Sequence, residues 1–174
     1  MSDRPAAISC IILAGGQGLR MGGKDKGWQK YHDRPLIEHV YGRLQGQVDD
    51  IVISCNRNLE RYATLAPAVA DPSPDFAGPL AGICAAAPLC QHQWLQLCPC
   101  DTPHIPLDLS AQLLRIALRQ NADAVFPQDH SGSHYLCALV HRRTLHAAQT
   151  ALARGKLRVS DWLNAVDALQ AVSY

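Results

Sequence analysis

Short apolar runs alternate along this chain with longer segments in which apolar residues recur at helical spacing. An unbroken apolar run at 8–14 stops at Gly15, which is typical of a strand buried on both faces. Helical spacing starts at Pro35, whose missing N–H suits a first helical turn. The pattern predicts strands at 8–14, 50–55, 68–70, 94–97, 122–126 and 136–140, and helices from Pro35 and at 78–89, 106–119 and 144–153.

This alternation of strands and helices predicts an α/β protein with a mainly parallel sheet covered on both faces. The 174 residues suit one domain spanning 1–174. In such sheets the crossovers are right-handed and ligands bind at the carboxyl ends of the strands. We therefore expect the chemistry to lie just after the strands, at 14–27, 54–58, 71–82 and 99–103.

The composition of the chain indicates which kinds of binding partner to expect. The formal net charge is +1, which indicates neither a nucleic-acid nor a membrane partner. The apolar runs are far shorter than the ~20 residues of a membrane helix. The seven cysteines are an odd number and most lie in apolar runs, so we expect free thiols in a reducing, cytoplasmic setting. Cys98 and Cys100 lack the second pair that a zinc site needs.

The most informative segment is the glycine-rich stretch at 13–27 (LAGGQGLRMGGKDKG). Glycines after a buried strand let the backbone approach a ligand with its N–H groups pointing inward. Arg20, Lys24 and Lys26 add three positive charges. Together these features predict a polyphosphate-binding loop.

Two familiar phosphate-binding motifs nearly fit this loop, and both fail. A Walker A loop has Ser or Thr after its lysine, but Asp25 follows Lys24. A dinucleotide fingerprint needs a third glycine where Met21 stands. The loop therefore matches neither of these motifs.

The loop resembles the signature loop of the molybdenum cofactor guanylyltransferases (MobA), through its L-A-G-G start, its R-M-G and its D-K pair. Further elements follow in the order that this family shows. They are C-N-R at 55–57, Asp71, G-P-L-A-G at 78–82 and C-D-T-P at 100–103. The resemblance covers roughly 8–145.

This resemblance implies a Rossmann-like three-layer α/β/α fold and transfer of GMP from GTP to molybdopterin, with Mg²⁺ as cofactor and cofactor-insertion proteins as further partners. It implies catalytic roles for Arg20, Lys26 and Asp101, with Asp101 as the Mg²⁺ ligand. The implied nucleotide-binding residues are Leu13, Ala14, Gly15, Gly16, Lys26, Ser54, Asp71 and Asp101, and those on the substrate side are Asn56, Gly78, Pro79, Leu80 and Gly82.

The sequence also departs from the family pattern. Ser54 stands where the family often has asparagine, Tyr135 follows His134 in place of proline, and the family's N-x-N-T-P segment does not occur. Two alternatives therefore stay open. One is a related transferase that uses CTP or a sugar phosphate, and the other is a nucleotide-binding protein without catalysis.

Individual residues also have purely structural interpretations. Asp71 and Asp101 are of a type that often serves turns. Gly78 and Gly82 are of a type that permits close packing of a helix on a sheet.

Overall fold

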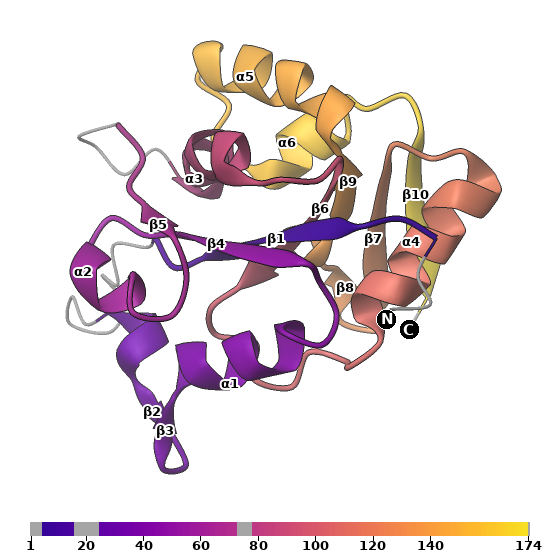
Figure 1. Ribbon diagram of the computed structural model, residues 1–174. Coiled ribbons are helices and arrows are strands. Elements are labelled where there is room, and N and C mark those ends of the chain that lie inside the picture. The colour runs from indigo at the N-terminus through magenta and orange to yellow at the C-terminus, as the bar shows by residue number, and fades with distance from the viewer. Residues whose placement is uncertain (1–4, 16–24, 73–77, 174) are drawn as a thin grey trace.

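A twisted central sheet organises the computed structural model, which describes residues 5–15, 25–72 and 78–173 (Figure 1). The strands run in the order β10-β7-β9-β6-β1-β4-β5, and β8 pairs with β7. All pairings are parallel except those of β9 with its two neighbours and of β8 with β7. The strand bounds are Ile8–Leu13 (β1), Asp50–Ser54 (β4), Ala68–Val69 (β5), Trp94–Pro99 (β6), Ala124–Asp129 (β7), Gly132–Ser133 (β8), Leu139–His141 (β9) and Leu169–Ser173 (β10).

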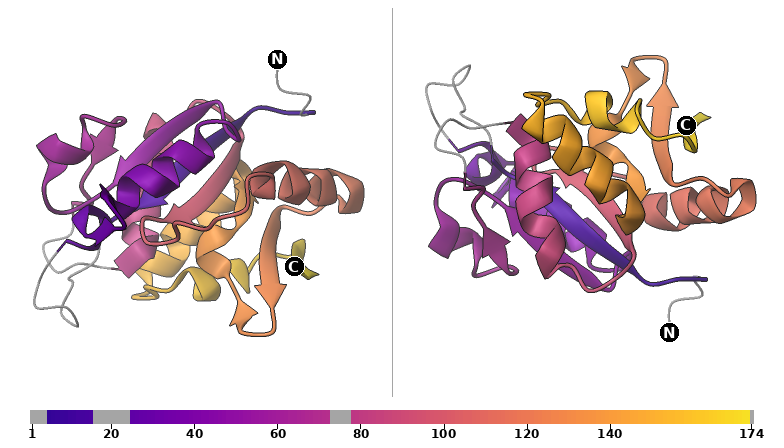
Figure 2. Two further views of the ribbon diagram at one scale, coloured as in Figure 1. Left: turned by 90° about the horizontal axis from the view of Figure 1, so that it is seen from below. Right: turned by 90° about the horizontal axis from the view of Figure 1, so that it is seen from above.

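Helices cover both faces of the sheet, as the two views of Figure 2 show. The helices α1 (Leu36–Leu44) and α4 (Leu109–Gln120) lie on one face. The helices α3 (Gly78–Ala86), α5 (Leu145–Ala153) and α6 (Val159–Leu163) lie on the other. This confirms the predicted α/β fold with its mainly parallel sheet between two helical layers.

The hydrophobic core forms on both sides of β1 because its side chains alternate in direction. Ile8, Cys10 and Ile12 pack with α1 and α4, whereas Ile11 packs with α3. All are fully buried. The uninterrupted apolar run of this strand therefore reflects burial on both faces, as the sequence predicts.

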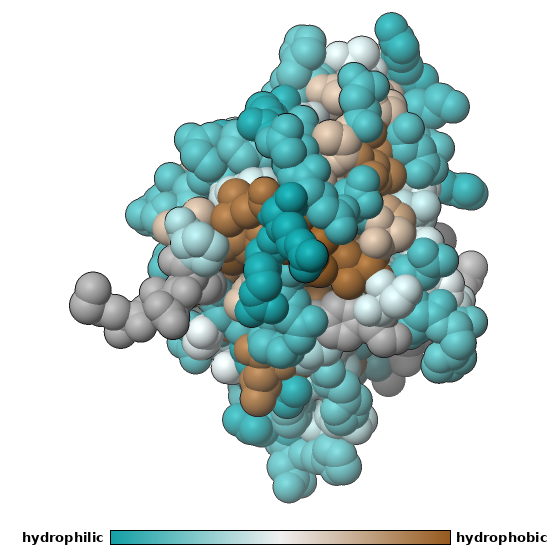
Figure 3. Space-filling view, turned by 90° about the vertical axis from the view of Figure 1, so that its right-hand side faces the viewer, coloured by the Kyte–Doolittle hydropathy of each residue, from teal (hydrophilic) through white to brown (hydrophobic). Residues whose placement is uncertain are grey.

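The C-terminal third differs from the sequence prediction. The segment predicted as a strand at 136–140 is a 3-10 turn at Tyr135–Cys137 followed by β9, which runs antiparallel. The strand β10 and helix α6 were not predicted. β10 lies at the sheet edge, and its side chains are partly buried or exposed, with none fully buried. Its short, weakly apolar sequence therefore carries little strand signal. The side of the molecule seen in Figure 3 is largely hydrophilic, with apolar residues gathered near its centre.

Smaller elements precede α3. A hairpin pairs β2 (Lys30–Tyr31) with β3 (Arg34–Pro35), and Pro35 is the N-cap of α1. The 3-10 helix η2 (Lys26–Trp28) and the short helix α2 (Leu59–Tyr62) lie near the carboxyl ends of β1 and β4. In the described ranges, no helix has the length and apolar character to cross a bilayer.

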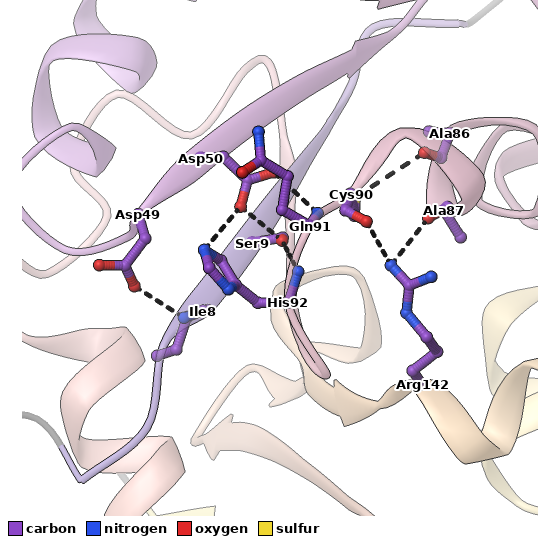
Figure 4. Close-up of polar contacts among 10 residues, drawn as sticks. All are labelled: Ile8, Ser9, Asp49, Asp50, Ala86, Ala87, Cys90, Gln91, His92 and Arg142. Carbon is purple, nitrogen blue, oxygen red and sulfur yellow. Dashed lines mark hydrogen bonds and ion pairs between the residues drawn. The ribbon is translucent and has the colours of Figure 1, made fainter.

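Polar contacts join β1 and β4 at their amino ends to the segment before β6 (Figure 4). Asp50 Oδ1 accepts a 2.6 Å hydrogen bond from Ser9 Oγ, which in turn accepts one from the His92 N–H at 2.9 Å. His92 Nε2 also lies 3.4 Å from Asp50 Oδ1. These contacts tie together the amino ends of the strands. Ligands of parallel α/β sheets bind at the opposite, carboxyl ends, where we therefore look for the candidate site.

Candidate functional site

The carboxyl ends of β1, β4 and β6 meet at one edge of the sheet. Leu13 is in register with both Ser54 and Pro99. The Ala14 N–H donates to the Ser54 carbonyl at 2.8 Å, and the Cys100 N–H donates to the Leu13 carbonyl at 3.0 Å. Segments that are remote in sequence are thereby brought together, as predicted.

These backbone bonds refine the predicted nucleotide contacts. The Leu13 carbonyl and the Ala14 N–H are already used within the sheet. Backbone recognition of a ligand is therefore expected from Gly15 onward. The predicted residues Gly16 and Arg20 lie outside the described residues.

Lys26 and Asp101 form an ion pair across the site. Lys26 Nζ lies 3.2 Å from Asp101 Oδ2, and the two side chains are 48% and 37% exposed. An exposed pair of this kind adds little to stability. Its charges therefore remain accessible to a ligand.

The carboxylate of Asp25 is held by three donors. Its Oδ1 accepts from the Gly27 N–H at 3.2 Å and from the Tyr62 hydroxyl at 2.5 Å. Its Oδ2 accepts from Asn58 Nδ2 at 2.9 Å. Burial, with the hydrogen bond to Asp25 as a second cause, raises the pKa of the Tyr62 phenol far above its ordinary value. Sequence reasoning missed Asn58 and Tyr62. Of the residues in this cluster, it singled out only Asp25, as part of the D-K pair.

Asn56 and Asp71 join the segments after β4 and β5. Asn56 Nδ2 donates to Asp71 Oδ2 at 2.6 Å, and the Asp71 N–H donates to Asn56 Oδ1 at 3.1 Å. A Cβ at Gly15 would lie 3.6 Å from Asn56 Nδ2, so the glycine-rich loop starts beside this pair. The structure thus places the predicted residues Gly15, Asn56 and Asp71 together.

The start of α3 lies against the ends of β1 and β4. A Cβ at Gly82 would lie 2.4 Å from Ser54 Oγ, closer than non-bonded atoms approach. Gly78 has a φ of +74°, which favours glycine. Leu80 is fully buried in the core, so its side chain packs there rather than at an open surface. The G-P-L-A-G element therefore permits close packing of helix and strands.

Two neighbouring cavities flank the end of β6. One of about 400 Å³ is lined by residues that include Pro79, Pro99 and Arg158. The other, of about 490 Å³, is lined largely by prolines, Ile105, Leu109 and histidines. Both include Thr102, His134 and Cys137, so they adjoin. Sequence reasoning indicated Pro79 and the segment at 99–103, but it missed Arg158, which has no motif around it.

His134 is held where the two cavities adjoin. Its Nε2 lies 3.1 Å from Asp129 Oδ2. Hydrogen bonds, first from the Ser131 hydroxyl and then from His134, lower the pKa of the Asp129 carboxyl below its ordinary value. No ion pair of Arg158 occurs among the described residues. This cation therefore stands available at the wall of the smaller cavity.

The donor chemistry of the site fits Mg²⁺. Within 5–15, 25–72 and 78–173, no three His, Cys, Asp or Glu side chains gather into a protein-only metal centre. Asp101 offers one partly exposed carboxylate at the end of β6. Mg²⁺ commonly takes one or two carboxylates and completes its shell with phosphate oxygens and water. The residues thus fit an ion held jointly with a nucleotide.

Comparisons with known proteins agree with this geometry. The family model of the MobA-like NTP transferase domain matches residues 10–169. A molybdenum cofactor guanylyltransferase from Pasteurella multocida is 40% identical over 87% of this chain and 81% of its own length. The protein of the same name from Pseudomonas syringae is 43% identical over 91% of this chain and 81% of its own length.

Solved structures share the fold. The molybdopterin-guanine dinucleotide biosynthesis protein A from Archaeoglobus fulgidus superposes with a TM-score of 0.76 at 20% identity, over 95% of this chain and 83% of that one. The 4-diphosphocytidyl-2C-methyl-D-erythritol synthase from Anaerococcus prevotii gives 0.70 at 16% identity, over 97% and 87%. At these identities the likeness concerns the fold alone.

Proposed function

Because the chain belongs to the family of MobA-like NTP transferases, it is a nucleotidyltransferase, and we propose that it transfers GMP from GTP to the terminal phosphate of molybdopterin. The products are molybdopterin guanine dinucleotide and pyrophosphate. The observation that carries the proposal is the pairing of Lys26 with Asp101, since it offers a cation to a triphosphate and a carboxylate to its metal ion.

In the proposed complex, GTP lies over the ends of β1 and β4. Gly15 and Gly16 offer backbone contacts, and Ser54 and Asp71 contact the nucleoside. Lys26 and Arg20 bind the triphosphate, and their positive charges stabilise the charge that accumulates on the leaving pyrophosphate. Asp101, together with phosphate oxygens, would hold Mg²⁺, which supplies further charge neutralisation when bound.

The chemical step requires little covalent help from the protein. An oxygen of the acceptor phosphate attacks the α-phosphorus of GTP, and the bond from this phosphorus to the oxygen that bridges it to the β-phosphorus breaks. Because the acceptor phosphate is already ionised at neutral pH, no general base is needed. The protein's task is to position two anions and offset their repulsion.

We place the acceptor in the two cavities beside β6. A pterin phosphate carries a flat ring system and a dianionic end. The larger cavity, with its prolines and Ile105, suits the ring, and the smaller one offers Arg158 to the phosphate. Arginine matches phosphate oxygens with a planar fork of donors. The acceptor phosphate would then lie near Thr102, which lines both cavities and follows Asp101 in the chain.

The test is pyrophosphate release from GTP, Mg²⁺ and molybdopterin, combined with thermal-shift measurements using GTP, CTP, ATP and UTP. We expect turnover and a GTP-specific rise in melting temperature. A clear preference for CTP would favour the cytidylyl alternative. Tight GTP binding without pyrophosphate release would favour a non-catalytic protein. The seven free thiols support the further proposal of a reducing, cytoplasmic site of action.

A further inference from the structure

We propose that Asp25, clamped by Tyr62 and Asn58, is a positioning residue that fixes the backbone beside Lys26 so that this lysine reaches the triphosphate. The inference rests on the proposed function, because it assigns Lys26 to the nucleotide. The inference is supported by the contacts that Asp25, Gly27 and Tyr62 make with one another.

The clamp joins two segments that are distant in sequence. Asp25 immediately precedes Lys26, while Asn58 and Tyr62 come from the start and end of α2. The three hydrogen bonds to Asp25 span 2.5–3.2 Å. Hydrogen bonds to an ionised carboxylate are stronger than bonds between neutral groups. The backbone that carries Lys26 is therefore attached to α2 on one side.

Tyr62 is a rigid point of attachment. It is fully buried, and its ring lies 5.1 Å from that of Trp28, centroid to centroid. The Arg61 guanidinium lies 3.8 Å above the Trp28 ring, a cation–π contact. The packing therefore holds Trp28 as well, on the other side of Lys26 from Asp25.

Gly27 allows this close approach. A Cβ at Gly27 would lie 2.3 Å from the Tyr62 hydroxyl oxygen, so only glycine fits. Asp25, Gly27 and Trp28 all contact Tyr62, and Lys26 lies between them with its side chain directed to Asp101 at 3.2 Å. A lysine side chain has many rotamers, and anchoring its backbone limits where its ammonium can lie. Tyr62 thus acts on the ligand through Lys26.

Loss of the clamp should affect nucleotides differently according to the number of their phosphates. Lys26 is assigned to the triphosphate, whereas the ends of β4 and β5 hold the nucleoside. Loosening the clamp should therefore weaken GTP binding much more than GMP binding. A tyrosine that served only overall stability would weaken both ligands to the same extent.

Calorimetry of Tyr62→Phe with GTP and with GMP, in the presence of Mg²⁺, tests this directly. Phenylalanine keeps the ring and removes only the hydroxyl. We expect the Kd of GTP to rise roughly five- to tenfold and that of GMP to stay within about twofold. Tyr41→Phe, on α1 away from the clamp, is the matched control and should leave both constants unchanged.

A double mutant separates this proposal from the proposed function. In a Lys26→Ala background, Tyr62→Phe should have no further effect on the Kd of GTP. An equal loss for GTP and GMP, no loss at all, or an undiminished loss in the Lys26→Ala background would overturn the clamp. If the wild type itself does not prefer GTP to GMP, the proposed function fails instead.

The conservative variant provides a second check. Asp25→Asn keeps one carbonyl oxygen to accept from Gly27 and Tyr62, whereas Asp25→Ala keeps none. We expect the ratio of GMP to GTP dissociation constants to fall less in Asp25→Asn than in Asp25→Ala. Equal ratios in the two variants would contradict a role for this acceptor oxygen.

Discussion

Lys26 Nζ lies 3.2 Å from Asp101 Oδ2, although the two residues are 75 positions apart in the chain. Before a nucleotide binds, the cation and the carboxylate neutralise each other across the site. In the complex that we propose, the ammonium would turn to phosphate oxygens and the carboxylate to Mg²⁺.

Lys26→Ala should lower pyrophosphate release by about 100-fold, because a positioned charge at the leaving group contributes on this scale. The melting temperature should change by only a few degrees, since the ion pair is exposed. Turnover and thermal unfolding are measured on the same preparations. Lys30→Ala, an exposed lysine in β2, is the control. Parallel losses of turnover and stability would indicate a structural role.

Gly82→Ala should destabilise the protein by about 1–3 kcal/mol, because overpacking forces neighbouring atoms to shift. The added Cβ would meet Ser54 Oγ at 2.4 Å, whereas Ser54 Cβ lies 3.4 Å away. Ser54→Ala in the same chain removes the clashing oxygen and should restore most of the loss. Urea denaturation of the two single variants and the double variant measures this coupling. Strictly additive losses would contradict it.

Asn56→Asp should lower both the melting temperature and GTP affinity at pH 7.5. The amide that donates to Asp71 Oδ2 at 2.6 Å becomes a second carboxylate, and the two repel each other. Part of the loss should return toward pH 5, where one carboxyl of the pair binds a proton. Thermal melts across this pH range test the idea, with Asn164→Asp after α6 as control. A loss that does not vary with pH would argue against carboxylate repulsion.

Arg158→Ala should raise the KM for molybdopterin by roughly 10-fold or more, the scale of a hydrogen bond to a charged group. The KM for GTP should stay unchanged, since Arg158 lines the smaller cavity, where we place the acceptor phosphate. Steady-state kinetics with each substrate varied in turn measures the KM for molybdopterin and the KM for GTP separately. Arg154→Ala, an exposed arginine just after α5, is the matched control. An equal change in both KM values would place the acceptor elsewhere.

Stability should fall as the pH rises above about 9. Burial raises the pKa of Cys55 and of Cys100 to about 12, from an ordinary value of 9.0. Between these values the unfolded chain loses thiol protons that the folded chain keeps, so the free energy of unfolding declines with rising pH. Urea denaturation with reductant at pH 7.5, 8.5 and 9.5 measures the slope. Cys55→Ala should make it shallower, and a flat profile in the wild type would contradict the prediction.

Much of the site could be predicted because its signals are local. A buried strand followed by glycines, and aspartates directly after strands, already place Gly15, Asp71 and Asp101 at one edge of a parallel sheet. By contrast, Tyr62 reads as an ordinary aromatic residue, and Arg158 as an ordinary surface arginine. Their significance depends on what lies beside them after folding.

The strand order of the sheet likewise has a part that the sequence predicts and a part that it does not. The sequence indicated strands at 122–126 and 136–140, but β9 lies between β6 and β7 and runs opposite to both. Strand direction is a matter of pairing between distant segments, and an apolar run of a few residues is compatible with either direction. β10 depends even more on its neighbour, because its own pattern is only weakly apolar.

The amino-acid sequence by itself thus determined the α/β class and the two-sided burial of β1, because each depends on residues close together in the chain. For the same reason it sufficed to predict a polyphosphate-binding loop after β1. Only the tertiary structure decided that Asp25 meets Tyr62, that Gly82 lies against Ser54 and that Arg158 lines a cavity beside β6. These relationships arise from packing between segments tens of residues apart. The local sequence around each residue does not specify which distant segment will pack against it.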